Sequence, residues 1–373
     1  MSFASSSSSS SSSSLHHSTP TPALQATPNL CYGAHHLSET IHLLSRHHAP
    51  TTIPKSVFYR LLRCCTDKQD VASGRSLYNL FTRCFARDAY LVCHFIRMFS
   101  SCGSLVDANK AFRNLVNPNV YAWGAIINAH VRFLCKKKAF ELYLEMIKTH
   151  VEPDGHVFVA VIKACACKEG LLYGREIHRK VRESGLKPDI VIDNALIDMY
   201  MKCQNVDNAY SVLTSAEKPN VASYNAFMSG CIDNQLFFLA IQCFWKMPTK
   251  PNIITYCSIL KACNEIQDVC QGRCVHRNIV DDGFDTDSNL AGSLVRMYSN
   301  FGWIEEAIYV FQHASERKLC LWNALMAGYV HNDAGMFAIS LYKQMQSECI
   351  RPDNVTFSSI TKACGMANQL HIG

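Results

Sequence analysis

The sequence predicts an all-α solenoid, in which pairs of helices stack into a superhelix. Three observations lead to this fold class. Short motifs recur about every hundred residues, a finer period of 31 to 35 residues lies within that spacing, and each short unit carries two helical patterns. Because a unit of about 33 residues cannot bury its apolar face alone, neighbouring units must pack against one another.

The long period is visible in two short motifs. "KAC" ends at residues 165, 263 and 364, and the related "RCC" ends at residue 65, so the copies lie 100, 98 and 101 residues apart. A second motif follows the first three copies, as "GRSLY" at 74–78, "GREIH" at 174–178 and "GRCVH" at 272–276. A motif that recurs at a fixed spacing indicates a repeat architecture.

The finer period is marked by proline followed by asparagine or aspartate. The second residues of these pairs are Asn119, Asp154, Asp189, Asn220, Asn252 and Asp353, at steps of 35, 35, 31, 32 and 101. Weaker boundaries near residues 287 and 318 divide the last step into 35, 31 and 35. These boundaries predict a helical array over 55–373, with repeats at about 55–88, 89–119, 120–154, 155–189, 190–220, 221–252, 253–287, 288–318, 319–353 and an incomplete one at 354–373.

The unit at 221–252 illustrates the two helical patterns. Asn220 suits the N-cap position, and "ASYNAFMSGCI" and "FFLAIQCFWKM" each place apolar residues at helical spacing. Pro248 and Pro251 end the second pattern. Ala240 is small where two helices must approach closely, and the same small residue recurs as Ala111, Ala139, Ala209, Ala307 and Ala338.

The first 54 residues differ from the rest. Ten consecutive serines run from Ser5 to Ser14, no acidic residue precedes Glu39, and no lysine or arginine precedes Arg46. A serine-rich, acid-poor N-terminus is typical of an organellar transit peptide, and the lack of early arginine favours the chloroplast over the mitochondrion. The segment 1–54 is therefore expected to be a disordered transit peptide, and the alternative is a low-complexity tail without a targeting role.

Composition excludes several other classes. The chain has 373 residues, 48% hydrophobic and 18% charged, with a formal net charge of +6, so it can form a large core and is compatible with a polyanionic partner. No apolar run reaches the ~18 residues of a membrane span, and "LFFLAIQCFW" (236–245) is expected to be a core helix. No membrane association is predicted.

The 19 cysteines are predicted to be small core residues of a reducing compartment. Cys165 and Cys167, in "KACACKEG", could form a zinc or redox pair, but Cys165 shares its position with Cys263 and Cys364, which favours packing. His178 and His276 recur at equal positions, where helix pairing explains them better than catalysis. No two cysteines have the C-x-x-C spacing of a zinc deaminase. The sequence thus predicts no enzyme, no metal site, no cofactor and no small-molecule substrate.

The repeats resemble the pentatricopeptide repeat family of plant organelles, in the form where standard, long and short repeats alternate. The standard type is seen in "VASYNAFMSG" (221–230), the long type in "VIKACACKEGLLYGREIH" (161–178) and the short type in "NALIDMYMKCQNVDNAYSVL" (194–213). The resemblance covers nearly everything after residue 55. It implies a right-handed superhelix that binds single-stranded RNA, one nucleotide per repeat.

The resemblance assigns base reading to the residue just after the aromatic position of the first helix and to the last residue of the repeat. The matching pairs are Asn194 with Asn220, Asn225 with Asn252, and Asn323 with Asp353. It implies cytosine for asparagine with asparagine and uracil for asparagine with aspartate. Asn220 and Asn252 are expected to cap helices with or without RNA, whereas Asn194 and Asn225 stand within a first turn, where asparagine is mildly unfavourable.

Other repeats depart from the pattern. The pairs Cys93 with Asn119 and Gly124 with Asp154 are weaker candidates for RNA reading, because glycine has no side chain and cysteine bonds poorly. A third pair, Gly292 with Lys318, has the same weakness, and the long repeats offer Val159 and Cys257. No base is assigned at these positions.

The resemblance implies a site-recognition factor for cytidine-to-uridine editing of organellar RNA, with editing or deaminase-bearing proteins as partners. RNA splicing or stabilisation is an alternative role, and a protein-binding scaffold of the tetratricopeptide kind is the main rival. The sequence stops at "QLHIG" (369–373), within a long repeat, so a truncated gene product is expected.

Overall fold

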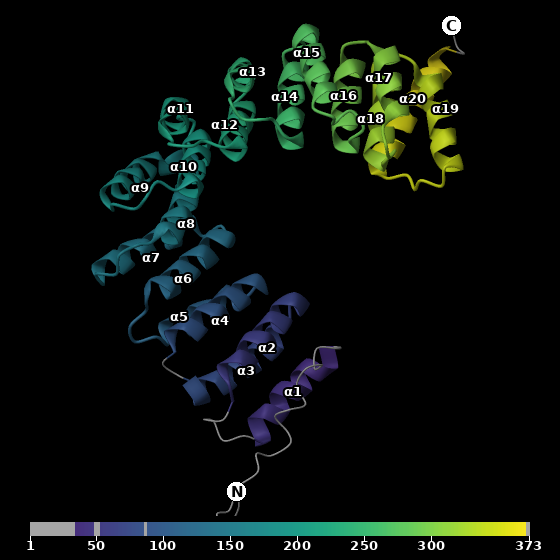
Figure 1. Ribbon diagram of the computed structural model, residues 1–373. Helices are drawn as coiled ribbons and strands as arrows, with labels where there is room; N and C mark the ends of the chain where they lie inside the picture. The colour runs from purple at the N-terminus through teal and green to yellow at the C-terminus, as the bar shows by residue number, and fades with distance from the viewer. Residues whose placement is uncertain (1–33, 48–52, 86–87, 371–373) are drawn as a thin grey trace, which may run out of the picture. The chain divides into compact units, whose positions relative to one another are not determined.

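The computed structural model describes residues 34–47, 53–85 and 88–370, and these residues contain 20 α-helices and no strand (Figure 1). The predicted all-α class is confirmed. The segment "VFVAVI" at 157–162, whose residues also suit a strand, lies within a helix because its apolar residues face neighbours on several sides. The predicted transit peptide falls largely on residues 1–33, which lie outside the described part of the chain.

The chain divides into two compact units, residues 1–117 and 118–373, and the division lies inside the predicted array. In the first unit α2 and α3 form one antiparallel pair, α4 and α5 form a second, and α4 packs against both α2 and α3. The bounds are α1 Ala34–His47, α2 Lys55–Lys68, α3 Val71–Phe85, α4 Ala89–Ser101 and α5 Leu105–Arg113.

Helix α1 differs from the expectation that residues 1–54 lack structure. It spans Ala34–His47 and packs against α2 and α3, with Leu37 and Ile41 almost fully buried. These two residues are four apart, so they lie on one face of a helix. The serine-rich composition of the N-terminus concealed this short amphipathic segment.

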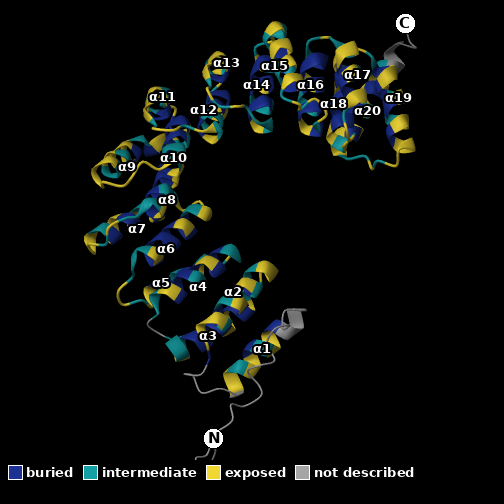
Figure 2. Cartoon of the chain, in the orientation of Figure 1, coloured by how far each residue is buried: buried dark blue, intermediate teal, exposed yellow. Residues whose placement is uncertain are grey.

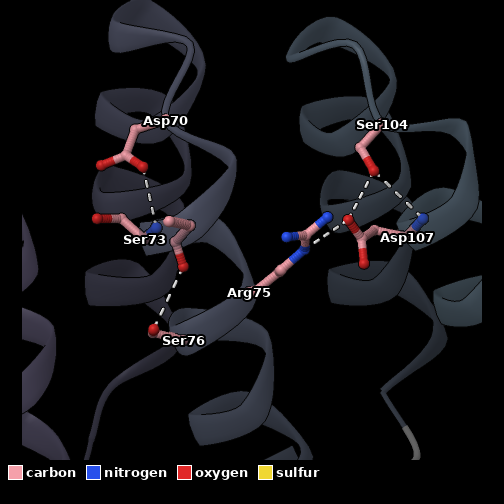
Figure 3. A network of polar contacts seen from close by, with 7 residues as sticks. Asp70, Ser73, Arg75, Ser76, Ser104 and Asp107 are labelled. Carbon is pink, nitrogen blue, oxygen red and sulfur yellow. Dashed lines mark hydrogen bonds and ion pairs between the residues drawn. The ribbon is translucent and has the colours of Figure 1, made fainter.

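Polar contacts join the second helices of the first unit (Figure 3). The Arg75 guanidinium of α3 donates to Oδ2 of Asp107 in α5 at 2.8 Å, and the Ser104 hydroxyl donates to the same oxygen at 2.6 Å. Ser104 is also the N-cap of α5. The ion pair therefore links α3 to the capped end of α5.

The second unit is built from two layers. Its first helices α6, α8, α10, α12, α14, α16, α18 and α20 form one layer, in which each contacts the next, and the second helices pack between successive first helices. The first helices are α6 Val120–Arg132, α8 Gly155–Cys165, α10 Ile190–Lys202, α12 Val221–Asp233, α14 Ile253–Glu265, α16 Ser288–Asn300, α18 Leu319–His331 and α20 Asn354–Leu370. The second helices are α7 Lys136–Lys148, α9 Leu171–Glu183, α11 Val206–Ser215, α13 Phe237–Lys246, α15 Val269–Asp281, α17 Ile304–His313 and α19 Gly335–Ser347.

First helices begin at the residues where the predicted repeats begin, and their sequences explain this. An asparagine or aspartate N-cap precedes most of them, and its side chain accepts a backbone N–H of the first turn, as Asn220 does for α12 and Asn252 for α14. The predicted capping by these two residues is confirmed. The division of the helix pairs into standard, long and short repeats stays a prediction.

Buried residues lie where helices face one another (Figure 2). The six alanines expected at close helix contacts are all fully buried. Glycines allow equally close contacts: a Cβ at Gly230 would lie 2.5 Å from Cβ of Met201, and one at Gly328 would lie 2.2 Å from Oγ of Ser299. The alanines all lie in second helices, whereas the two glycines lie in first helices and allow successive first helices to pack closely.

The stretch "KACACKEG" is where one helix pair departs from the others. Helix α8 ends at Cys165, and a 3-10 turn at Lys168–Gly170 replaces its last turn. The freed carbonyl of Ala166 accepts from the Lys136 ammonium at 2.7 Å. The carbonyl of Cys167 accepts from the Gly170 N–H at 2.9 Å and from the Cys203 thiol at 3.0 Å. The stretch therefore binds neighbouring helices through its backbone.

The prediction that the cysteines are core residues is confirmed for some of them and is wrong for others. Among the described residues, the exposed cysteines are Cys135, Cys270, Cys274, Cys320, Cys349 and Cys364. Cys165 and Cys263 are buried, and burial raises the pKa of each thiol to about 12, so neither supplies a thiolate. Cys364, expected to share this packing, is exposed, because the described residues include no helix after α20 that could cover it.

His178 and His276 pair helices, in the manner that the sequence favours. Nδ1 of His178 lies 2.9 Å from the Tyr200 hydroxyl, and Nδ1 of His276 lies 2.8 Å from the Tyr298 hydroxyl. Each contact joins a second helix to the following first helix. Burial lowers the pKa of both imidazoles, that of His178 to about 4.

Candidate nucleic-acid interface

The first-helix layer of the second unit carries three of the predicted reading pairs. In two of them, Asn225–Asn252 and Asn323–Asp353, the fifth residue of one first helix lies within hydrogen-bonding distance of the capping residue of the next first helix. The capping residues Asn220, Asn252 and Asp353 bind backbone amides through their side chains, and Asn252 has extended backbone (φ −117°, ψ 178°). Capping therefore holds one member of each pair in place before any ligand binds.

Asn225 and Asn252 form the first organised pair. Nδ2 of Asn225 donates to Oδ1 of Asn252 at 3.2 Å. The Thr255 hydroxyl, from the first turn of α14, lies 2.7 Å from Oδ1 of Asn225 and 2.9 Å from Oδ1 of Asn252. The Thr255 hydroxyl oxygen accepts from the Asn252 backbone N–H at 3.1 Å. Three side chains from two helices thus form one network.

Asn323 and Asp353 repeat this geometry. Nδ2 of Asn323 donates to Oδ1 of Asp353 at 3.0 Å, and the Thr356 hydroxyl lies 2.7 Å from Oδ1 of Asn323. The Thr356 backbone N–H donates to Oδ1 of Asp353 at 2.9 Å. This hydrogen bond, followed by those from the Thr356 hydroxyl and Asn323, lowers the pKa of Asp353, so the carboxylate is charged at neutral pH.

The two networks differ in one atom. Oδ1 of Asn252 and Oδ1 of Asp353 receive equivalent hydrogen bonds, from an asparagine amide and from a threonine. The other side-chain atom takes part in none of these contacts. In Asn252 that atom is Nδ2, a donor, and in Asp353 it is Oδ2, an acceptor. Two sites of the same shape therefore offer opposite hydrogen-bonding groups.

Asn194 and Asn220 are not brought into such a network. Asn220 caps α12 through Ala222 and Ser223, at 2.9 and 3.1 Å. Oδ1 of Asn194 is buried and has no hydrogen-bond partner among the described residues. Since a buried carbonyl without a partner is costly, Asn194 is the unsatisfied member of the three pairs.

The weaker pairs are placed as follows. Asp154 caps α8 by accepting from Val157 N at 2.9 Å, opposite Gly124, which has no side chain to contribute. Asn119 caps α6 in the second unit, whereas Cys93 belongs to α4 of the first unit, is 2% exposed and donates to the Ala89 carbonyl. Burial raises the pKa of Cys93 to about 11.

Gly292, Lys318 and Cys257 offer no similar network. A Cβ on Gly292 would meet nothing within 4 Å, and Lys318 precedes α18 without a side-chain cap and lies 3.4 Å from Glu316. The Cys257 thiol contacts the Ser293 hydroxyl at 3.8 Å.

Sequence reasoning missed two sets of residues. One is the hydroxyl at the third position of the following first helix, at Ser223, Thr255 and Thr356. Its signal was a serine or threonine three residues after each reading cap. The other is an exposed apolar residue at the second position of first helices, which occurs at Tyr90, Tyr121, Val191, Ile254 and Val355.

Two of these exposed apolar residues, Ile254 and Val355, lie beside the organised pairs. A groove of about 720 Å³ contains Asn323 and Asp353, with Cys320 and Val355 among its lining residues. Ile254, which is 63% exposed, stands beside the Asn252 cap. A flat aromatic ligand could place its faces against such apolar residues and its polar edge against the amide and carboxylate.

The described residues also bear on metal binding and on membrane spans. Within the described ranges, no group of three or more histidine, cysteine, aspartate or glutamate side chains is arranged to hold a metal ion. The triplet His150-Val151-Glu152 has the H-x-E spacing of zinc deaminases, but it lies in the connection between α7 and α8 with both polar side chains exposed. Among these same residues, no helix combines the length and apolar character of a bilayer span.

Three family descriptions match parts of the sequence. "PPR repeat family" matches residues 317–366, "Pentatricopeptide repeat domain" matches 176–234, and "PPR repeat" matches 121–150 and 222–251. The last match includes Asn225, and the first includes Asn323 and Asp353.

Relatives in Arabidopsis thaliana carry the same family name. A chloroplastic pentatricopeptide repeat-containing protein is 29% identical over 90% of this chain and 40% of its own length, and a mitochondrial one is 28% identical over 85% and 46%. A further chloroplastic one is 31% identical over 74% and 35%. The chain thus spans between about a third and a half of the length of the curated relatives it matches.

The fold is similar to that of a solved repeat solenoid. The crystal structure of the pentatricopeptide repeat protein PPR10 from maize gives a TM-score of 0.54 at 18% identity, over 93% of this chain and 59% of that one. The structure of PPR10 in complex with an 18-nucleotide psaJ RNA element gives 0.50 at 15% identity, over 90% and 59%. At these identities the likeness concerns the fold.

Proposed function

Because the chain is a pentatricopeptide repeat protein of the plant type, we propose that it binds single-stranded RNA along its first-helix layer, one base per repeat. The observation that carries this proposal is the network that occurs twice, at Asn225–Asn252 and Asn323–Asp353. Each network presents polar groups beside exposed apolar side chains, which suits an unstacked base. That PPR10 forms a complex with RNA supports the same use of the fold.

The outward atoms suggest which bases are read. In both networks the fifth-residue asparagine keeps a second Nδ2 hydrogen that can donate to the O2 carbonyl shared by both pyrimidines. Nδ2 of Asn252 can donate to N3 of cytosine, which is an acceptor. Oδ2 of Asp353 can accept from N3–H of uracil. We propose cytosine opposite Asn225 and Asn252, and uracil opposite Asn323 and Asp353.

The Asn194 and Asn220 pair extends this reading by one repeat. By the same pairing rule it takes cytosine, next to the cytosine of Asn225. The repeats at 253–287 and 288–318 offer Cys257 and Gly292, so no base is assigned there. The proposed site is thus two pyrimidines, two unassigned bases and a uracil.

The finer role we propose is recognition of a cytidine-to-uridine editing site in an organelle. The unequal repeat spacing, with units of 35, 35 and 31 residues, supports membership of the subclass that alternates standard, long and short repeats. The chloroplastic and mitochondrial names of the relatives support an organelle, and the serine-rich N-terminus supports the chloroplast. In this proposal the chain supplies recognition, and a partner protein supplies the deaminase.

Selection from a random single-stranded RNA pool with the full chain tests RNA binding. We expect enrichment of two pyrimidines and a uracil at the stated spacing. Asn225→Ala should weaken binding of the selected RNA by about 5- to 150-fold, since one base contact carries about 1–3 kcal/mol. Asn79→Ala, an exposed asparagine on the second helix α3, is the matched control. No enrichment, together with equal affinity for both variants, would favour a protein-binding scaffold.

Two further experiments test the finer role. The first 60 residues fused to a fluorescent protein should enter chloroplasts, and a cytosolic signal contradicts targeting. Sequencing of organellar transcripts from a plant lacking this protein should show the loss of one or a few editing events. Unchanged editing with altered splicing or transcript ends would replace the editing role with one in splicing or stability.

A further inference from the structure

The buried hydroxyl that joins each reading pair comes from the repeat that follows it. Thr255 and Thr356 are the third residues of α14 and α20, and both side chains are completely buried. Each reaches back to an asparagine about 30 residues earlier in the chain, at 2.7 Å. Complete burial keeps these hydroxyls away from any ligand, so a direct contact with RNA does not explain them.

Hydrogen counting shows what the hydroxyl does. The Thr255 oxygen accepts the Asn252 backbone N–H at 3.1 Å, and the Thr356 oxygen accepts the Asp353 N–H at 3.2 Å. Each hydroxyl then has one hydrogen to donate, and its nearest acceptor is Oδ1 of the fifth-residue asparagine. Since that oxygen is held toward the threonine, Nδ2 must point toward the capping residue and outward.

The third pair lacks this arrangement. Ser223 occupies the equivalent position in α12 and is also completely buried, and its oxygen accepts the Asn220 N–H at 3.3 Å. Its hydrogen, however, is directed to Oδ1 of Asn220 at 3.3 Å, and Oδ1 of Asn194 stays unpartnered. Serine lacks the methyl group that restricts threonine to few side-chain rotamers. The same position thus holds a reader in two repeats and fails to hold it in the third.

We propose that Thr255 and Thr356 are positioning residues that set the amide orientation of Asn225 and Asn323, and that Ser223 leaves Asn194 free to turn. This inference rests on the proposed RNA-binding function. A held amide presents only donors to the base, whereas a turning amide presents a donor or an acceptor. The base opposite Asn194 is therefore read less strictly than the base opposite Asn225, although both pairs consist of two asparagines.

The test uses one variant that should add the positioning hydrogen bond and one that removes it. Competition binding with the full chain measures the affinity ratio of cytosine to purine at the base opposite Asn194 and at the base opposite Asn225. Ser223→Thr should raise the first ratio by about 3- to 10-fold, the effect of one added hydrogen bond, and leave the second unchanged. Thr255→Val, which keeps the shape but removes the hydroxyl, should lower the second ratio by a similar factor.

Controls separate positioning from packing. Thr255→Ser keeps a hydroxyl and should retain more of the base ratio than Thr255→Val does. A purely structural role would lower the affinity for every RNA equally and leave both ratios unchanged. Thr356→Val repeats the loss at an independent site, where the ratio of uracil to purine is measured, so a poorly folded Thr255→Val does not decide the outcome.

A failure of the proposed RNA binding can be distinguished from a failure of the positioning role. If the wild type binds no single-stranded RNA, the proposed function is wrong. If the wild type discriminates bases and both ratios stay the same in Ser223→Thr, Thr255→Val and Thr356→Val, the positioning role is wrong while the proposed function stands.

Discussion

Asp353→Asn should change the base read by its repeat from uracil to cytosine. Oδ1 of Asp353 accepts from Asn323 and Thr356 at 3.0 and 2.9 Å, and Oδ1 of Asn252 accepts from the equivalent groups at 3.2 and 3.0 Å. The chain thus already contains the arrangement that the variant would create. The substitution leaves the inward oxygen in place and replaces the outward acceptor by a donor.

The size of the change follows from the contacts at stake. With uracil, the variant loses an acceptor for N3–H and faces that group with a second donor. With cytosine, it gains a donor for N3. Because each base-edge contact is worth about 1–3 kcal/mol, the two effects together should exceed about 2 kcal/mol. That corresponds to a change of roughly thirtyfold or more in the ratio of uracil to cytosine affinity.

Competition binding with two RNAs that differ only at this base measures the ratio. The matched control is Asn252→Asp. It should move the preference at the base opposite residue 252 from cytosine toward uracil and leave the preference at the base opposite Asp353 unchanged. Chemical denaturation checks that both variants fold. A ratio that stays within about threefold of wild type in both variants, with folding intact, would refute the assignment of reading to the outward atom of the capping residue.

Three predictions concern stability, each measured by urea denaturation. Gly328→Ala places a Cβ against a buried serine and should destabilise the chain by about 1–3 kcal/mol, whereas Gly292→Ala, in open space, should be neutral or slightly stabilising; equal effects would contradict the close helix contact. Gly170→Ala should cost more than Gly292→Ala, because its Cβ would lie 2.0 Å from a backbone carbonyl oxygen. The pKa of His178 falls from 6.5 to about 4 on folding, so its contribution to the free energy of unfolding is complete above pH 6.5 and declines as pH falls toward 4. His178→Gln should reduce this dependence of the unfolding free energy on pH. An unchanged dependence would show that other groups cause it.

Much of this fold could be predicted from the sequence because the deciding forces are local. Asparagine and aspartate caps fix where most first helices begin, and proline stops and apolar periodicity indicate how far the helices extend. Helix α1 was missed, because its two core residues stand within a segment of misleading composition. The shortened end of α8 was also missed, because the turn after Cys165 depends on donors from Lys136 in α7 and from Cys203 at the end of α10.

In the candidate site, too, only some of the contacts could be predicted from the sequence. The pairing of Asn225 with Asn252 could be anticipated from the family pattern, and the structure brings the two within 3.2 Å. The hydrogen bond from Thr255 to Asn225 could not be anticipated. A threonine in the first turn after an N-cap is a common capping residue, and its sequence position does not indicate a distant partner. Oδ1 of Asn194 lacks a partner among the described residues because the Ser223 hydroxyl donates to Asn220 instead. The spacing of the repeats cannot predict the direction of one hydroxyl.

The three pairs limit how much specificity this chain supplies. At about 1–3 kcal/mol per base contact, two held pairs give about 2–6 kcal/mol, and a fully effective third pair would raise this to about 3–9. Specific nucleic-acid complexes exceed non-specific ones by about 4–10 kcal/mol, and the net charge of +6 adds attraction that does not depend on sequence. Two held pairs alone therefore fall at the low end of that range. If Ser223→Thr improves base discrimination as proposed, the natural serine holds the specificity of the chain at the low end of this range. Selection of one RNA site must then draw on further contacts, such as those of a bound partner protein.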